Sequence, residues 1–335
     1  IGKNNFLLFI TIFFCNLFIT LYSLLNYFFF VLTGDTPTPD GVLYGFYNIR
    51  FFNQFQVLCI PFIIYFLKHN KLSRIATIIL TLNFFLFFMS GARGAIVSTS
   101  CMVIFSIYYK LVDKENLLTL LKCCIGGGIL FFCYFLYHNT PETVEYLIRT
   151  NSSNRFSIWS ELISQITTKN IVIGNGSGVF FSEKFGVSHP HNSILQLLYN
   201  WGLITTTLLT VIVLNFIKTS TQYVKKNSIP EFNSCLQAFL ALIIYSLVTG
   251  ILVMPIPQTF IFILAGVLLS YLPIQLKTNK SSSKKLGIYS LLSLFYILLV
   301  ILSYNCLDST PYGPNFWSYG QLSFSQCKII LFKDL

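Results

Sequence analysis

Long hydrophobic runs dominate this sequence, and short polar segments separate them. A helix needs about 20 apolar residues to cross a hydrocarbon core about 30 Å thick. Nine runs approach this length: residues 6–32, 51–67, 75–90, 94–111, 117–137, 191–217, 233–253, 258–276 and 287–303. The pattern predicts an all-α fold, a polytopic transmembrane helical bundle of about nine spans, with one larger outer loop that carries an amphipathic helix.

The composition agrees with this pattern. Of the 335 residues, 54% are hydrophobic and 10% are charged, where a soluble domain carries about 25% charged residues. Together with 35 Phe and a mean hydropathy of +0.69, this excludes an ordinary soluble enzyme. The net charge of +11 sits largely on lysines between apolar runs, which mark cytoplasmic loops, so we expect no nucleic-acid partner. Because the chain begins at Ile1 rather than Met, we expect further sequence before it.

The positive residues alternate between the polar segments and so predict an orientation. If residue 1 is cytoplasmic, thirteen of them are cytoplasmic: Lys3, Lys68, Lys71, Arg74, Lys110, Lys114, Lys218, Lys225, Lys226, Lys277, Lys280, Lys284 and Lys285. The outer segments hold Arg50, Arg93, Arg149, Arg155, Lys169, Lys184, Lys328 and Lys333. This divides the chain into N-terminal spans (1–137), an outer loop (138–190), C-terminal spans (191–303) and an outer tail (304–335). Cys306 and Cys327 both lie in that tail, where an oxidising compartment would permit a disulfide between them.

Arginine and lysine are not distributed alike. The four arginines on the outer side, out of five in the chain, are Arg50, Arg93, Arg149 and Arg155. Membrane topology depends only on positive charge, so it does not explain the choice of arginine over lysine. A guanidinium group, unlike an ammonium group, binds phosphate and carboxylate with two parallel hydrogen bonds. An outward-facing anion site is therefore one interpretation. Snorkelling, or pairing with Glu142, Glu145, Glu161 or Glu183, is the alternative.

The outer loop contains an amphipathic segment. From Arg155 to Ile166, apolar residues recur at spacings of three and four: Phe156, Trp159, Leu162, Ile163 and Ile166. This spacing predicts a helix on the membrane surface or over the bundle, capped by the asparagines between 151 and 154. Arg155 then lies in the first turn, where the helix dipole disfavours a cation. This position indicates that Arg155 serves something other than the stability of the helix.

Two further motifs follow in the same loop. The glycine-rich segment 174–178 lacks both a βαβ context and a P-loop lysine, so we interpret it as a tight turn. His189, Pro190, His191 and Asn192 then stand at the re-entry into an apolar run, where imidazole can titrate near neutral pH. A helix-capping polar cluster is the alternative. No second His or carboxylate follows His191 at helical spacing, so no metal is expected.

In this order and spacing, the motifs resemble the O-antigen ligase and polymerase superfamily. They comprise a Ser-Gly-x-Arg-Gly turn at 90–94, Arg155 and Trp159 before the glycine-rich turn, and His191-Asn192. Nine residues then separate Asn192 from Gly202-Leu203-Ile204-Thr205, in the form that the superfamily shows.

The resemblance implies an inverting membrane glycosyltransferase of the GT-C kind that needs no cofactor. Its donor would be a glycan on undecaprenyl pyrophosphate, used on the periplasmic side of the bacterial inner membrane in lipopolysaccharide biosynthesis. The residues expected to be catalytic are His191, Arg93 and Arg155. Those expected to bind substrate are Arg50, Arg149, Trp159, His189 and Asn192.

Three functions remain open. A ligase would transfer the glycan to the lipid A-core, and a polymerase would transfer it to a second lipid-linked repeat unit; the short outer loop favours the polymerase. A transporter is the third, since many-helix bundles are common. Transporters place polar groups at mid-membrane on broken helices, whereas the deep interior here shows only Lys122 and a glycine kink at 126–128.

Overall fold

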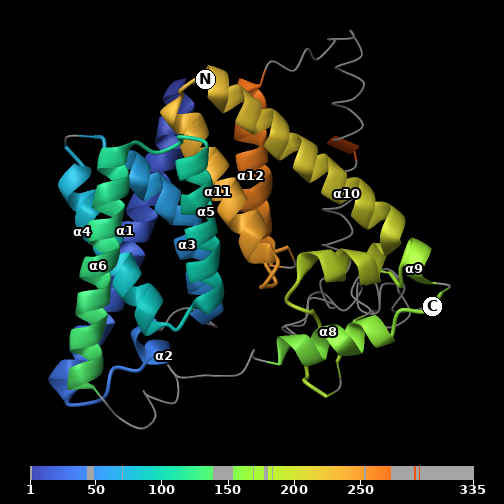
Figure 1. Ribbon diagram of the computed structural model, residues 1–335. Coiled ribbons are helices and arrows are strands. Elements are labelled where there is room, and N and C mark those ends of the chain that lie inside the picture. The colour runs from blue at the N-terminus through green and yellow to red at the C-terminus, as the bar shows by residue number, and fades with distance from the viewer. Residues whose placement is uncertain are drawn as a thin grey trace. The chain divides into compact units, whose positions relative to one another are not determined.

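The computed structural model describes residues 2–43, 49–69, 71–138, 154–168, 170–176, 180–182, 184–252 and 254–272, together with 290, 291 and 294. Across these ranges the regular structure is helical, apart from an isolated antiparallel bridge between Ser182 and Val187 (Figure 1). The all-α prediction is therefore confirmed. The chain divides into two compact units, residues 1–152 with 214–272 and residues 153–213 with 273–335, and each is described by itself.

Long helices build the first unit. They are α1 (Gly2–Thr33), α3 (Ile49–Phe66), α4 (Ser73–Met89), α5 (Arg93–Tyr108), α6 (Lys114–Tyr137), α11 (Pro230–Ser246) and α12 (Pro255–Tyr271), with one turn of helix in α2 (Pro39–Val42). The helix α10 (Ser193–Lys226) begins in the second unit and ends in the first. The expected span at 233–253 ends early as a helix, because the chain leaves helical geometry after Ser246. The next helix begins at Pro255, three residues before the predicted span 258–276, and is described to Tyr271.

Four helices are long and apolar enough to cross a membrane: Phe6–Thr33 within α1, then α3, α6 and α10. Shorter apolar helices stand where the sequence predicted spans at 75–90, 94–111 and 258–276. The predicted span 287–303 lies outside the described residues except for three positions. The chain thus has the helical architecture of a membrane protein.

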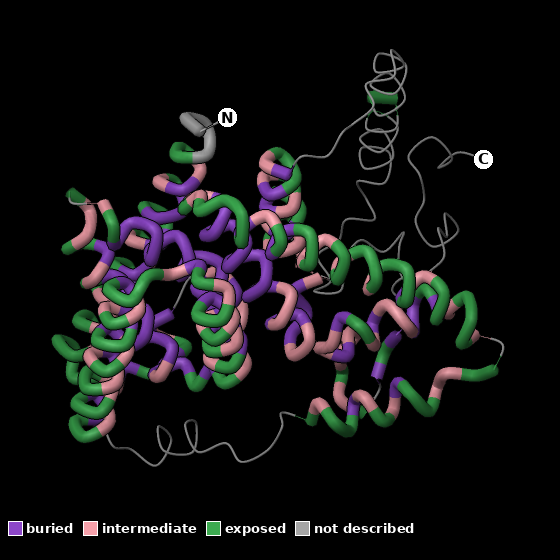
Figure 2. The backbone as a smooth tube through the Cα atoms, turned by 45° about the horizontal axis from the view of Figure 1, so that its top comes forward, coloured by how far each residue is buried: buried purple, intermediate pink, exposed green. Residues whose placement is uncertain are grey.

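The outer surfaces of α1 and α6 carry large apolar side chains. On α6 the exposed residues include Leu118, Leu121, Ile125, Ile129, Phe132 and Leu136, and Figure 2 shows the contrast between such exposed faces and the buried interior. A soluble monomer rarely exposes so long a continuous apolar face. Lys122, which the sequence placed within an apolar run, is exposed on α6.

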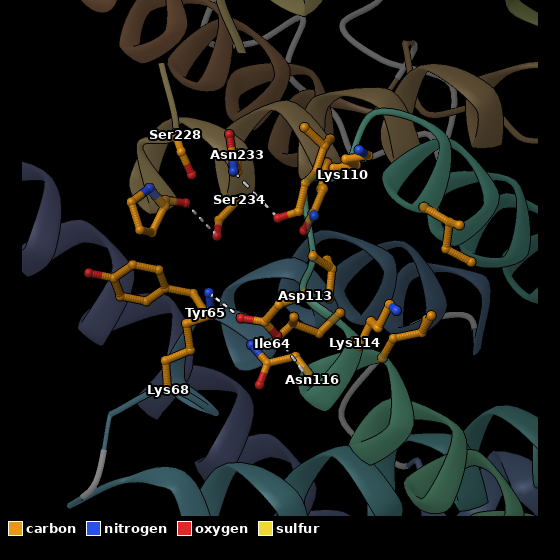
Figure 3. Close-up of a pocket in the computed structure, with 16 residues that line it drawn as sticks. Ile64, Tyr65, Lys68, Lys110, Asp113, Lys114, Asn116, Ser228, Asn233 and Ser234 are labelled. Atoms are coloured by element: carbon orange, nitrogen blue, oxygen red, sulfur yellow. Dashed lines mark hydrogen bonds and ion pairs between the residues drawn. The ribbon is translucent and has the colours of Figure 1, made fainter. Parts of the chain in front are cut away.

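Lysine-bearing turns gather at one end of the first unit, which we call the lysine end. The C-terminal ends of α3 and α5 and the starts of α6 and α11 line one cavity there (Figure 3). Lys225, near the end of α10, places its Nζ 5.6 Å from the centre of the Tyr109 ring. The predicted grouping of the turns around residues 68, 110 and 225 is therefore present in the structure.

Arg50 and Arg93 lie at the opposite end, which we call the arginine end. They begin α3 and α5, whose other ends reach the lysine cavity. A helix of 18 residues, the length of α3, is about 27 Å long. The two kinds of cation are thus separated along the helices, as the alternation in the sequence predicted.

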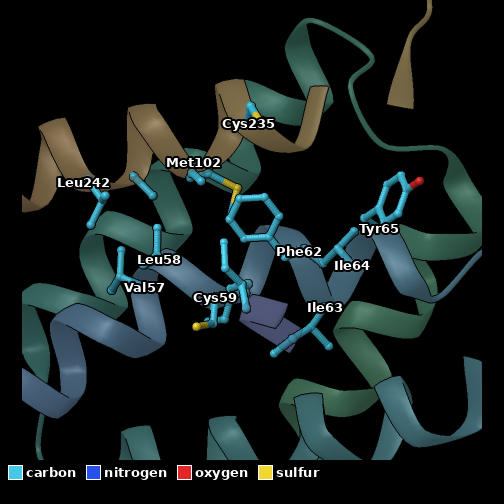
Figure 4. Close-up of a cluster of buried hydrophobic side chains, with 14 of the residues drawn as sticks. Val57, Leu58, Cys59, Phe62, Ile63, Ile64, Tyr65, Met102, Cys235 and Leu242 are labelled. Carbon is cyan, nitrogen blue, oxygen red and sulfur yellow. The ribbon is translucent and has the colours of Figure 1, made fainter. Parts of the chain in front are cut away.

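Helix α3 is the centre of the first unit. It is buried on all sides along most of its length, which is the pattern of an interior helix. Figure 4 shows its apolar side chains packed with Met102 of α5 and with Cys235 and Leu242 of α11. Phe62 also packs edge-to-face on Phe9 of α1, with the ring centres 4.8 Å apart.

The glycine triplet in α6 does not kink the helix. Residues 114–137 form one helix, and Gly127 lies against α4, where an added Cβ would stand 2.6 Å from the Cβ of Phe84 and 2.8 Å from the backbone of Thr81. The prediction of a kink at 126–128 is therefore wrong. The glycine permits close packing of two helices, a common use of small residues between apolar helices.

A buried amide network joins α1, α3 and α4. Asn83 Nδ2 donates to Asn16 Oδ1 at 2.8 Å, and Gln56 Nε2 donates to Asn83 Oδ1 at 3.2 Å. All three residues are buried within the apolar interior. The sequence did not reveal this cluster, because its members are isolated amides on three separate runs.

The second unit has a small core of its own. Helix α8 (Arg155–Ser164) packs on the first part of α10 through Ile158, Leu162, Phe180 and Tyr199. The predicted amphipathic face is partly wrong: Ile158 belongs to the buried side, whereas Phe156 and Ile163 are exposed. Of the predicted capping segment 151–154, only Asn154 lies within the described residues; it has a left-handed backbone and its side chain makes no capping hydrogen bond.

Helix α10 is broken at Gly202, where φ is +73° and ψ is 179°. Here it meets the chain at the end of α9 (Asn170–Ile173): an added Cβ on Gly202 would lie 2.1 Å from the carbonyl oxygen of Val172. Gly174, with φ of +82°, lies equally close to the backbone of Asn200. Gly174 to Gly176 therefore lie against α10, while the rest of the predicted tight turn at 174–178 falls outside the described residues. The single run expected at 191–217 is two helical segments.

Candidate functional site

The turn from His189 to His191 is fixed to α8 by one hydrogen bond. The indole N–H of Trp159 donates to the carbonyl oxygen of Pro190 at 2.6 Å. On either side of Pro190, the rings of His189 and His191 lie 4.1 Å apart between centres, nearly perpendicular to each other. Two predicted site residues are thereby held together by a third from another helix.

His191 has an unusual backbone. Its φ is +54°, in the left-handed region that is uncommon for residues other than Gly, although Asn, Asp and His adopt it more often than other residues do. Such conformations cluster at functional sites, where the surrounding structure holds them. A half-buried histidine at this point, directly before a helix, is therefore oriented by the backbone as well as by its neighbours.

Asn192 is the N-cap of α10. Its Oδ1 accepts hydrogen bonds from the backbone N–H groups of Ile194 and Leu195, both at 3.0 Å. The capping interpretation is therefore correct for this residue, and only its amide NH₂ remains to contact a substrate.

Arg155 is the first residue of α8 and lies one turn before Trp159. Side chains four residues apart on a helix are neighbours, with about 5–6 Å between their Cβ atoms. The structure therefore brings Arg155, Trp159 and the segment from His189 to Asn192 together in the second unit. Arg149, the remaining predicted residue of the loop, lies outside the described residues.

Arg50 and Arg93 belong to the first unit, at its arginine end. Arg50 is the second residue of α3 and Arg93 the first of α5. Ser90 Oγ donates to Asn53 Oδ1 at 3.1 Å, which ties the turn before Arg93 to α3 one turn beyond Arg50. Gly91 completes this turn with φ of +57°. The two arginines are thus held on linked, rigid elements.

The position of these arginines is electrostatically unfavourable for the helices themselves. Arg50, Arg93 and Arg155 stand in first turns that carry no acidic residue, where the helix dipole is already positive. Arg74 shares this position at the start of α4, at the lysine end, so the position alone does not define a site. Guanidinium groups and the backbone N–H groups of a helix's first turn together attract anions.

The other two histidines lie in aromatic clusters. His69 packs against Phe6, Tyr65 and Phe66 at the lysine end. His138 contacts Tyr27 and Tyr134 at the end of α6, and its burial lowers its pKa, which favours the neutral ring. Both are therefore structural residues.

One buried polar group near the site was not predicted. Gln196 lies one turn after Asn192 on α10, and its Oε1 is buried without a hydrogen-bond partner among the described residues. Its signal in the sequence was the spacing of four from Asn192, which places both on one face of the helix. Within the ranges described, no group of three or more His, Cys, Asp or Glu lies close enough to hold a metal ion.

No known family model, curated protein or solved structure matches this chain. The fold and the site define its class only as an all-helical protein of membrane type, with a histidine turn in one unit and an arginine end in the other.

Proposed function

We propose that the protein is a membrane glycosyltransferase of the O-antigen ligase and polymerase kind. The observation that supports this most directly is the hydrogen bond from Trp159 to Pro190, which holds two histidines at the start of α10 beside the helix that begins with Arg155. Arg155, Trp159 and His191 also carry part of the sequence resemblance.

The proposed reaction needs a base and a cation. A hydroxyl oxygen of the acceptor sugar attacks the anomeric carbon of the donor, and the bond from that carbon to the pyrophosphate oxygen breaks with its electron pair on the leaving group. The proton of the hydroxyl passes to His191. Arg155, which lies in the same unit as His191, stabilises the charge that develops on the departing pyrophosphate and so favours the transition state over the ground state. For Arg93 the same role rests on the sequence resemblance alone. Direct displacement inverts the anomeric centre.

The proposed setting is the bacterial inner membrane, with about nine spans and the site facing the periplasm. More positive residues lie in the turns of the lysine end (Lys68, Lys71, Arg74, Lys110 and Lys114) than at the arginine end (Arg50 and Arg93), which supports this orientation because cytoplasmic loops are enriched in Lys and Arg. The lysine end would then be cytoplasmic. A polyprenyl pyrophosphate donor would approach the arginine end from the outer leaflet.

The acceptor separates the first proposal, transfer to the lipid A-core, from the alternative, transfer to a second lipid-linked repeat unit. A transporter is less well supported. It would bind cargo at polar groups between its spans, whereas Asn16, Gln56 and Asn83 hydrogen-bond one another and leave only Gln56 Oε1 of this network unpartnered among the described residues.

The decisive experiment is transfer by the purified protein in proteoliposomes. The donor is an undecaprenyl-pyrophosphate glycan, offered in parallel with lipid A-core and with a second lipid-linked repeat. We expect an inverted glycosidic product with one of the two acceptors and without added metal. Absence of product with both acceptors, alongside uptake of the glycan into the lumen, would contradict the proposal and favour a transporter.

A further inference from the structure

A cavity of about 570 Å³ opens at the lysine end of the first unit (Figure 3). It lies between the ends of α3 and α5, the turn before α6 and the first turns of α11. Its apolar walls come from Ile64, Ile107, Leu111 and Leu117. None of the residues proposed for glycan transfer lines it.

The charged lining carries an excess of positive charge. Lys68 Nζ pairs with Asp113 Oδ2 at 2.5 Å, and this pair leaves Lys110 and Lys114. Neither of these two has an ion-pair partner in the part of the chain that the structure describes. Two ammonium groups are therefore available to an anion at one cavity.

Lys110 occupies a position that favours glycine. It follows the end of α5 with φ of +56°, and its N–H donates to Ile107 O at 3.2 Å while Leu111 N–H donates to Ser106 O at 2.8 Å. This is a common way for a helix to end, usually with Gly in the left-handed position. Lys110 thus lines the cavity from a left-handed backbone conformation that is less favourable for lysine than for glycine.

Two amides of α11 supply a second, independent indication of a ligand. Asn233 and Gln237 both line the cavity, and Gln237 is 1% exposed. Asn233 Nδ2 donates to Leu111 O at 3.4 Å, whereas its Oδ1 is buried without a hydrogen-bond partner among the described residues. A buried amide with no partner is unfavourable unless a ligand or water satisfies it.

We propose that this cavity binds the phosphate headgroup of an anionic phospholipid. Lys110 and Lys114 would pair with the phosphate, Gln237 would hydrogen-bond a headgroup oxygen, and the apolar walls would contact the acyl chains. A lipid is the better source than a free phosphate, because the cavity is largely apolar and lies at the end of helices that include two of membrane length, α3 and α6. Basic pockets between helices on the cytoplasmic side are suited to anionic headgroups. Lipid binding here is independent of glycan transfer.

The test is titration of the detergent-solubilised full chain with phosphatidylglycerol or phosphatidylcholine, followed by native mass spectrometry. We expect preferential binding of phosphatidylglycerol. The double variant Lys110→Gln, Lys114→Gln should lose about tenfold or more of that affinity, on the scale of one lysine contact each. The matched double variant Lys122→Gln, Lys218→Gln removes the same charge from exposed positions off the cavity and should bind as the wild type does.

A second variant tests the amide. Gln237→Leu fills a similar volume without polar atoms, so it should weaken phosphatidylglycerol binding while the unfolding temperature stays at or above that of the wild type. Equal binding of the two lipids, or equal loss in the two lysine pairs, would overturn the proposal. Competition by millimolar inorganic phosphate would overturn the assignment to a lipid and leave a free anion as the ligand.

Discussion

At the scale of single residues, the choice of arginine over lysine carries the functional argument. The described arginines all begin helices: Arg50, Arg74, Arg93 and Arg155. Arg74 lies at the lysine end and the other three do not, so it is a matched control for residue type and helix position.

Arg93→Lys and Arg155→Lys should each reduce glycan transfer by about tenfold or more, because an ammonium cannot make the two parallel bonds that a guanidinium makes to phosphate. Arg74→Lys should leave the transfer rate unchanged. The measurement is the initial rate in proteoliposomes at equal protein level. Equal rates in all three variants would mean that only charge matters.

The pair of Lys68 and Asp113 predicts a pH dependence of stability. Burial alone would raise the pKa of Asp113, but the hydrogen bond and charge of Lys68 and the N–H of Asn116 outweigh it and hold this pKa below its ordinary value. A lowered folded-state pKa stabilises the protein above the ordinary value of 3.8, and this stabilisation is lost as the pH falls through the lowered pKa.

Asp113→Asn should keep the helix cap and lose the ion pair, which is about half exposed. We expect a decrease of about 0.5 kcal/mol in unfolding free energy at pH 7 and none at a pH below the lowered pKa. Thermal unfolding in detergent at both pH values measures this. An equal decrease at the two values would assign the effect to the cap rather than to the charge.

At the scale of elements, close helix packing was the feature hardest to predict. The long apolar runs predicted α1, α3, α6 and α10, since length and hydropathy are visible in sequence. The role of the glycine triplet was not visible, because a glycine that bends a helix and a glycine that allows another helix to pack closely have the same sequence pattern. Ile158 was likewise missed, since burial in α8 depends on where α10 packs.

Gly127→Ala and Gly128→Ala form an adjacent pair that tests this packing. A Cβ on Gly127 meets Phe84 and backbone atoms below 3.0 Å, whereas one on Gly128 meets only a ring carbon of Phe88 at 3.8 Å. Gly127→Ala should destabilise the protein by about 1–3 kcal/mol, and Gly128→Ala should be neutral or slightly stabilising. Unfolding temperatures that change alike would contradict the close approach of α4 and α6.

At the scale of the whole molecule, the pattern of lysines and arginines predicted which turns lie at the same end of the first unit, which the spacing of apolar residues does not show. The lysine turns around 68, 110 and 225 meet at one end of the first unit, and Arg50 and Arg93 lie at the other. Within the second unit, the sequence predicted the histidine turn but not its anchor, because the bond from Trp159 to Pro190 joins residues 31 apart. The proposed disulfide of Cys306 and Cys327 stays a prediction, since both lie outside the described residues.

The most direct test of the proposed function is replacement of His191. His191→Asn is the best variant, because asparagine tolerates the left-handed backbone at φ of +54° but cannot accept the hydroxyl proton. His189→Asn changes the adjacent ring, which we expect to matter less, and His69→Asn changes a histidine of the lysine end.

The measurement is the single-turnover rate of glycan transfer in proteoliposomes, with the unfolding temperature of each variant as the control for folding. We predict that His191→Asn loses about a hundredfold or more in rate at an unchanged unfolding temperature, and that His69→Asn keeps the wild-type rate. A folded His191→Asn variant that transfers glycan at the wild-type rate would contradict the assignment of His191 as the base.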